Sequence, residues 1–360
     1  MDIHNKIHQN GFSIIEMMIS ITIGLIILAG LTAIFISNSR ARTEIERANR
    51  QIENGRYALQ LLSDDVRLAG YYAEFDPSGL TSPGALIDPC VTSLVGLRDG
   101  LPLHVQGYDN VTTTTFPTWT CPINPSDVKP GTDILVIRRA STCEAGIGDC
   151  DPVAANLVPY FQASLCSNPA QLNFPIVNND SYLRSYYQLD TKPDNLTLNK
   201  RDCTTVAALH RYLTHIYFIA NNNKPGDGIP TLKRAELGID PATGSLGFPI
   251  VALVDGIENL QLQYGIDSPT VDGAPDSYNA APASVNDWRA VVSIKINLLA
   301  RNTEPTSGYN TTATSTTKKY TLGYDAGGAP IIVGPFTDSF KRHAYQSEVR
   351  VNNAAGRNLP

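Results

Sequence analysis

The distribution of apolar and polar residues divides the beginning of the chain into distinct stretches. Residues 1–11 are polar and contain no apolar run, whereas residues 12–36 are almost wholly apolar apart from Glu16 and a few small or hydroxyl residues. As a helix, residues 12–36 would be about 37 Å long, enough to cross a hydrocarbon core of about 30 Å. A cleaved secretory signal has a shorter apolar run that is followed by small residues. We therefore expect residues 12–36 to form a membrane-spanning helix that stays with the protein.

Beyond residue 36 the pattern changes to a single stripe of apolar or small residues, spaced alternately by three and four positions. The stripe consists of Ile45, Ala48, Ile52, Gly55, Leu59, Leu62, Val66 and Ala69. This spacing is typical of one face of a helix, and no proline interrupts it. We predict one helix from Phe12 to about Leu68, with residues 37–70 as an amphipathic half that packs on a globular domain. A two-stranded coiled coil is the alternative, but Gly55 in its seam disfavours it.

The second half of the chain has the alternating pattern of β-strands. Residues 212–220 and 231–237 flank a Pro/Gly-rich turn and predict a hairpin. Residues 257–266 and 290–298 alternate apolar and polar positions, which predicts strands with one buried face. We therefore expect an α+β fold, in which the helix stripe covers one face of an antiparallel sheet and leaves the other face in water.

Residues 71–210 are rich in turns, and the clearest strand in them is 133–138. This region contains all six cysteines, and their spacing lacks the close pairs of a zinc site. An even number of cysteines in a loop-rich region favours three disulfides and an oxidising compartment. Many connectivities are possible, and six unpaired core thiols are the alternative. We favour bonds between neighbours in sequence, namely Cys90–Cys121, Cys143–Cys150 and Cys166–Cys203.

Composition and motifs argue against several classes of function. The formal charge is -6, from 34 acidic against 28 basic residues, and charged residues make up only 17% of the chain. Such a chain is a poor candidate for binding a phosphate backbone, so no nucleic-acid partner is predicted. The sequence also lacks a nucleophile elbow, a metalloprotease helix and a phosphate-binding loop. We predict a protein that is not an enzyme and that has no cofactor or metal site; calcium bound in a loop of other than EF-hand geometry is the alternative.

Two groups of titratable residues receive structural interpretations. Asp64 and Asp65 lie on the predicted helix and are expected on its solvated surface. His210 and His215 are five positions apart on a predicted strand, which places them on opposite faces. We therefore do not expect these histidines to share a ligand.

Glu16 is the anomaly of the apolar stretch, because a carboxylate in a bilayer core costs about 3 kcal/mol. Such a residue is functional by default, although a Glu near the end of a span can also reach the headgroups. The segment Gly11-Phe12-Ser13-Ile14-Ile15-Glu16 resembles the cleavage motif of the type IV pilin superfamily. The polar leader, the Gly-Phe junction, the acid and the apolar anchor all occur in the order of that family.

This resemblance implies a defined maturation and a role for the acid. A prepilin peptidase would cut between Gly11 and Phe12 and then methylate the new amino terminus of Phe12, so that residues 1–11 are a leader. The small Gly11 can enter a tight protease site. Glu16 of one subunit would then pair with the Phe12 amine of a neighbour as the helices stack. In a low dielectric this attraction is strong enough to set the assembly register.

More narrowly, the order of the later segments is similar to that of the PilW-type minor pilins. These segments are residues 133–139, 215–219, 254–264 and 289–302. The resemblance implies a pilin architecture with a large loop-rich, disulfide-stapled insertion at residues 71–210, followed by a sheet domain at residues 211–360. The chain differs from a major pilin in its greater length, in the lack of a kinking proline in the anchor and in its cysteine positions.

The resemblance implies a minor pilin that spans the inner membrane once, with its C-terminal domain in the periplasm, and then enters the pilus. There it would pack near the tip with other minor pilins and the major pilin, prime assembly and present a tip adhesin. A minor pseudopilin of a type II secretion system is one alternative. A membrane-tethered periplasmic enzyme or ligand-binding domain, in which Glu16 is incidental, is the alternative from another class.

The arginines that follow the anchor argue against this orientation. Arg40, Arg42, Arg47 and Arg50 outnumber the single Lys6 before it, and the positive-inside rule would place the large domain in the cytoplasm. The six cysteines favour the periplasm instead, and we give them the greater weight.

Overall fold

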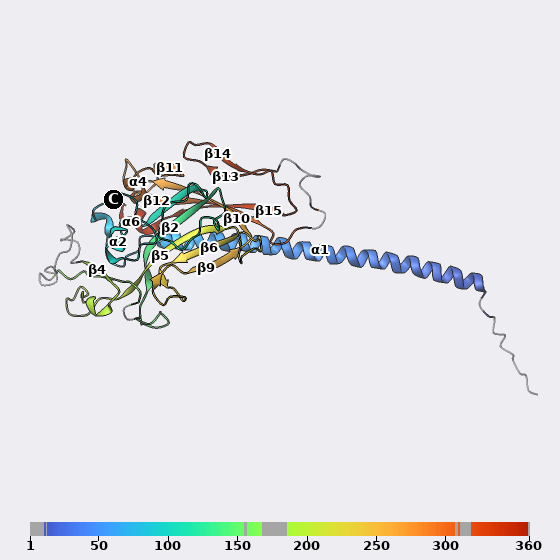
Figure 1. Ribbon diagram of the computed structural model, residues 1–360, viewed down its shortest axis with the longest axis horizontal. Coiled ribbons are helices and arrows are strands. Elements are labelled where there is room, and N and C mark those ends of the chain that lie inside the picture. Colours follow the sequence, from blue (N-terminus) through green and yellow to red (C-terminus); the bar gives the residue numbers. More distant parts are fainter. Residues whose placement is uncertain are drawn as a thin grey trace, which may run out of the picture. The chain divides into compact units, whose positions relative to one another are not determined.

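The computed structural model describes residues 11, 13–154, 157–167, 186–306, 309 and 318–358 (Figure 1). The chain divides into two units, Met1–Arg50 (unit 1) and Gln51–Pro360 (unit 2). The helix α1 (Ile14–Leu68) is one helix of 55 residues that contributes to both units. The predicted long N-terminal helix is therefore confirmed, and its observed end at Leu68 is the predicted one.

The described part of unit 1 consists almost entirely of the first part of α1. Its apolar side chains are exposed, for example Ile14 at 81% and Phe35 at 74%. The helix contains an 18-residue window with a mean hydropathy of 2.6, and none of that window is buried. By length and composition, α1 can cross a membrane.

Unit 2 is built from two antiparallel sheets. The first sheet has the order β1-β2-β5-β3-β4, and β6 and β9 extend it from the β5 edge. Its strands are β1 (Val105–Val111), β2 (Thr132–Glu144), β3 (Tyr160–Ala163), β4 (Tyr187–Asp190), β5 (His210–Ala220), β6 (Thr231–Glu236) and β9 (Ile250–Asp255). The predicted hairpin corresponds to β5 and β6, which pair in antiparallel register.

The second sheet has the order β11-β10-β12-β15. Its strands are β10 (Ile257–Ile266), β11 (Ser277–Asn279), β12 (Val291–Arg301) and β15 (Arg342–Arg350). Two small ribbons are β7 (Gly238–Ile239) with β8 (Leu246–Gly247), and β13 (Tyr320–Tyr324) with β14 (Pro330–Val333). The short helices are η1 (Pro77–Gly79), α2 (Leu94–Asp99), η3 (Pro193–Asn195), α4 (Val285–Arg289) and α6 (Asn352–Arg357). Together with α1, these sheets confirm the predicted α+β class.

Each face of the first sheet contributes to a different core. Leu135 of β2 and Tyr217 of β5 belong to a core shared with Leu62 of α1 and with the second sheet. Val136 and Phe218, the next residues along the same strands, belong to a second core under residues 72–128. The sheet is therefore buried on both faces, as expected when successive side chains point in opposite directions.

The strand β10 of the second sheet is covered on both faces, so the prediction of a half-covered sheet is wrong there, whereas on β15 the polar face stays exposed at Gln346, Glu348 and Arg350. All ten residues of β10 are buried, including Gln261 and Gln263 on its polar face. Gly323 of β13 covers this polar face, because a Cβ there would lie 2.8 Å from Nδ2 of Asn297. Its backbone also has a φ of 86°, which favours glycine. The alternating pattern remained because the covered face is polar, and Nε2 of Gln261 on it donates to the carbonyl oxygen of Gly131 at 2.8 Å.

The turn-rich region contains more sheet than expected. It contributes β1, β3 and β4 as well as a β2 that extends beyond the predicted residues 133–138. Disulfides join Cys90 to Cys121, Cys143 to Cys150 and Cys166 to Cys203, in the neighbour-to-neighbour order that the sequence analysis favoured. In the described part of the chain no cysteine is free. The Cys90–Cys121 crosslink restrains a loop of the second core, to which Cys90 belongs and against which Cys121 packs.

Candidate functional site

The N-terminal candidate site lies at the start of α1. Gly11 and Ser13 are exposed just before the helix, whereas Phe12 lies outside the described residues. The backbone N–H of Ser13 donates a hydrogen bond to Oε2 of Glu16 at 3.1 Å. Glu16 thus caps the amino end of its own helix, where a negative charge also complements the helix dipole. The N–H group that binds this carboxylate belongs to Ser13, which follows Phe12, the expected new amino terminus, in the sequence.

The remaining polar side chains of the apolar stretch satisfy their hydrogen bonds within the helix. The hydroxyls of Ser20, Thr22 and Thr32 donate to the carbonyl oxygens of Glu16, Met18 and Leu28 at 2.7–2.8 Å. Such hydroxyls do not need water, which suits a lipid or helix-lined environment. At Gly24 and Gly30 a Cβ would meet no atom within 4 Å, so each leaves room for a close neighbour.

Within unit 2, the part of α1 from Gln51 onward packs on the sheets through buried polar contacts as well as apolar ones. Nε2 of Gln51 donates to the carbonyl oxygens of Ala300 and Lys341 at 2.9 and 3.0 Å. A Cβ at Gly55 would lie 2.2 Å from Cε2 of the Tyr345 ring, so only glycine allows this approach. The predicted stripe is therefore partly wrong: Ile52 is 42% exposed, because Gln51 occupies the buried face.

A buried ion cluster anchors the last turns of α1. Oδ1 of Asp65 accepts from Nε of Arg139 on β2 at 2.7 Å. Its Oδ2 contacts Nδ1 of His215 at 2.6 Å and accepts from the Tyr217 hydroxyl at 2.9 Å, both on β5. The expectation that Asp65 lies on the solvated surface is therefore wrong. It holds for Asp64, which is exposed and pairs with Arg67 at 2.9 Å.

The electrostatics of the cluster keep Asp65 ionised. Burial alone raises the pKa of the Asp65 carboxyl, but His215 and Arg139 outweigh it and hold that pKa well below its usual range. Both ring nitrogens of His215 face carboxylates, Asp65 at 2.6 Å and Glu236 at 3.6 Å. Among the described residues no hydroxyl or thiol nucleophile bonds to this histidine, so the geometry suits docking rather than nucleophilic catalysis.

The other histidine that the sequence singled out lies elsewhere. Nδ1 of His210 contacts the carbonyl oxygen of Ser141 at 2.8 Å, and His210 makes no contact with the Asp65 cluster. No local sequence motif could have revealed the cluster, because Asp65 is 150 positions from His215. The only local signal was the position of Asp65 next to Val66 of the apolar stripe.

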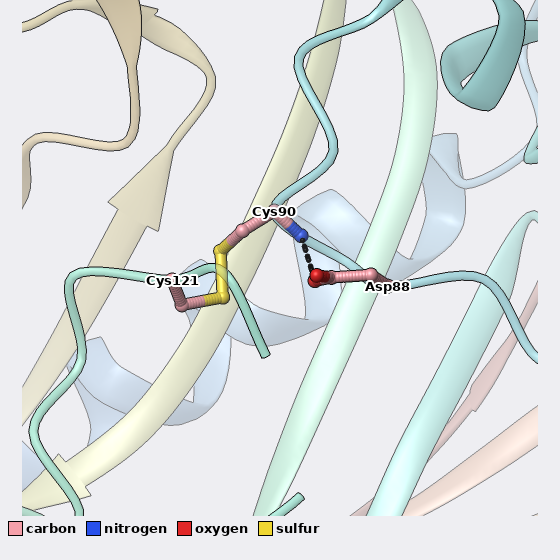
Figure 2. Close-up of side chains that lie close together, drawn as sticks. All are labelled: Asp88, Cys90 and Cys121. Carbon is pink, nitrogen blue, oxygen red and sulfur yellow. Dashed lines mark hydrogen bonds between the residues drawn. A yellow bond between two sulfur atoms is a disulfide. The ribbon is translucent and has the colours of Figure 1, made fainter. Parts of the chain in front are cut away.

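One group of side chains has the spacing of a metal site but a different chemistry. Asp88, Cys90 and Cys121 place their ligand atoms within 4.8 Å of one another. Figure 2 shows that the two cysteines are joined by a disulfide, while Asp88 accepts from the backbone N–H of Cys90 at 2.9 Å. The other oxygen of Asp88 accepts from the backbone N–H of Thr120 at 2.9 Å. The carboxylate thus holds the crosslinked loop together, and neither sulfur is a thiolate that could bind a metal.

Two family models match the chain, one at the start of α1 and one in the sheets of unit 2. A sequence model of the type IV pilus-assembly protein W family matches residues 216–353, from β5 to α6. A model of the prokaryotic N-terminal methylation motif matches residues 6–32, which include the Gly11–Glu16 segment. No curated protein matches the chain.

Among solved structures, the chain is similar to the type IV-like pilin TTHA1219 from Thermus thermophilus. The two share 12% identity over 63% of this chain and 82% of that one, with a TM-score of 0.29. The two sequence matches lie in the expected order, with the methylation motif at the start of α1 and the family domain in the sheets. The chain therefore contains a region similar to the type IV pilus-assembly protein W family, preceded by a prokaryotic N-terminal methylation motif at the start of α1.

Proposed function

We propose that this protein is a minor pilin of a type IV pilus. A prepilin peptidase removes residues 1–11 and methylates Phe12, and residues 12–36 then anchor the chain in the inner membrane. The disulfide-bonded unit 2 lies in the periplasm until the protein enters the pilus. There it packs near the tip with other minor pilins and the major pilin, helps to initiate the fibre and presents a tip adhesin.

The observation that carries this proposal is the composition of the first part of α1. Its apolar side chains are exposed, and its hydroxyls are satisfied within the helix. Its only acid in the methylation-motif region is Glu16, at the amino end. A neighbouring subunit with a free Phe12 amine would supply both an apolar surface and a countercharge. The three disulfides support the oxidising periplasm as the compartment of unit 2.

The experiment tests Glu16 directly. The variant Glu16→Ala should insert in the membrane as well as the wild type or better, because a charge has been removed from the span. Its amount in sheared fibres should fall at least about tenfold, the effect of losing roughly 1.4 kcal/mol of pairing. The matched control is Glu46→Ala, which removes an exposed acid of the same helix beyond the apolar stretch.

Normal incorporation of Glu16→Ala would contradict the pairing. A strain without prepilin peptidase provides a second arm, in which the chain should keep residues 1–11 and stay out of fibres. If the leader is retained on a protein that works normally, a membrane-tethered periplasmic domain becomes the better description. Dependence on type II secretion components rather than pilus components would instead identify a minor pseudopilin.

A further inference from the structure

A pocket of about 410 Å³ lies in unit 2 next to the end of α1. Its polar lining includes Ser78, His104, Asp267, Asn286, Arg289 and Arg357. Gly70, just beyond α1, lies against this lining, because its carbonyl oxygen accepts from Nη2 of Arg357 at 2.8 Å. The pocket is therefore at the opposite end of the docked helix segment from Gln51.

Arg289 is a partly buried cation that lacks an acidic partner. Its Nη2 donates to the carbonyl oxygens of Ser78 and Leu80 at 2.8 and 3.2 Å, and its Nη1 contacts the Ser82 hydroxyl. These acceptors are neutral, and in the described part of the chain no carboxylate pairs with this guanidinium. Burial alone lowers its pKa. An incoming anion would offset the cost of holding this charge partly out of water.

The acidic group in the pocket wall already accepts hydrogen bonds from its surroundings. The carboxylate of Asp267 accepts from the backbone N–H groups of Asp272 and Gly273 at 3.1 and 2.9 Å, and from Nδ2 of Asn358 at 2.8 Å. Arg357 pairs with Asp76, which lies outside the lining, at 3.2 Å. Arg357 and Asp267 thus both have partners, and Arg289 is the cation of the lining that has no acidic partner among the described residues.

The pKa of His104, which also lines the pocket, depends on nearby arginines. Burial lowers the pKa of His104, a hydrogen bond to the carbonyl oxygen of Val291 raises it, and three arginines lower it, so that the net pKa is about 4. These arginines are Arg357, Arg289 and Arg138. The histidine is therefore neutral at pH 7, and Arg289 is one of the cations that disfavour its protonation.

We propose that this pocket binds an acidic peptide segment of a partner protein, with the guanidinium of Arg289 as the contact for a carboxylate. Asn286 supplies a neutral polar group beside it at the exposed rim. A peptide fits better than a free ion, because the pocket volume falls in the range of about 300–1,000 Å³ that holds drug-sized ligands. The identification of the partner as a fibre component rests on the proposed function, whereas the binding itself does not.

The test uses the full-length chain in detergent micelles and fluorescence anisotropy of a labelled hexaglutamate peptide. Hexaglutamine should bind at least about tenfold more weakly, and so should hexaglutamate to Arg289→Gln. Asn286→Asp adds a negative charge at the rim without removing a contact of Arg289, so it should also weaken binding. Arg201→Gln, which removes an exposed arginine outside the pocket, should bind like the wild type.

Equal binding of hexaglutamine would overturn the proposal, and so would wild-type affinity in Asn286→Asp. If Arg289→Gln loses its near-UV circular dichroism, Asn286→Asp decides the question. Acetate at a matched concentration of carboxylate should not displace the peptide, and displacement would show a small-anion site instead. Failure of peptide binding while Glu16-dependent assembly persists would refute the pocket alone, and the reverse result would refute the minor-pilin role alone.

Discussion

The two parts of α1 are both helical, but the first exposes its apolar side chains whereas the second buries polar ones. Over residues 14–50 the apolar side chains are exposed and the hydroxyls bond to their own helix. Over residues 51–68 the buried face includes the polar residues Gln51 and Asp65. Both are bonded to partners in the sheets. The first part is thus complementary to a non-aqueous environment outside the chain, whereas the second part is already docked.

The difference shows how one helix can serve two purposes. Docking through Asp65 is specific, because a buried carboxylate tolerates only a surface with donors in the right places. An apolar stripe would be less selective and would compete with the apolar first part for the same sheet surface. We interpret the buried ion cluster as the feature that fixes the last turns of α1 on the sheets of unit 2.

The largest expected effect is that of breaking the ion cluster. Asp65→Asn leaves Arg139 and His215 without their buried counter-ion, and should lower the free energy of unfolding of unit 2 by about 3 kcal/mol. The adjacent Asp64→Asn should change it by no more than about 0.5 kcal/mol, because that side chain is exposed. Urea unfolding of the full-length chain, followed by the fluorescence of the buried Trp288, measures both. Similar losses in the two variants would mean that the cluster does not anchor the helix.

A second comparison uses glycines from the two parts of α1. Gly55→Ala forces a methyl group into the Tyr345 ring and should cost about 2 kcal/mol, as overpacking usually does. Gly30→Ala meets no atom and removes a flexible residue from a helix, so it should cost nothing. The same unfolding experiment applies. A stable Gly55→Ala protein would show that the helix does not approach the sheet as closely as described.

The free energy of unfolding of unit 2 should also depend on pH through Asp65, which lies in the docked part of α1. Because the pKa of Asp65 is depressed in the folded state, its contribution is fully present above the ordinary pKa of about 4 and is lost as the pH falls below it. The difference between wild type and Asp65→Asn should therefore shrink by about 1 kcal/mol between pH 7 and pH 3. Urea unfolding at both pH values tests this. A constant difference would exclude a depressed pKa.

The smallest effect is expected where the sequence pattern misassigned the buried face. Ile52→Ser should change the free energy of unfolding by no more than about 0.5 kcal/mol, because this side chain is largely exposed in unit 2. A loss of several kcal/mol would mean that Ile52 lies on the buried face, as the sequence pattern predicts. Measurement in the same urea series allows direct comparison with the Asp65 and Gly55 variants.

Features set by neighbours in sequence were predictable, and features set by distant partners were not. The continuous helix, the β5–β6 hairpin and the strands β10 and β12 follow from local periodicity. The burial of Asp65 depends on β2 and β5, which lie far along the chain. The covering of β10 by β13 likewise joins distant segments whose own patterns are weak. The pocket at Arg289 was missed because its lining comes from several short loops and helices.

The most direct test of the central claim is the intact mass of this chain recovered from purified fibres. We expect a polypeptide that begins at Phe12 and carries one added methyl group on its amino terminus. A polypeptide that begins at Met1 in normally assembled fibres would contradict it, because Glu16 would then lack the cationic partner on which the proposed packing depends.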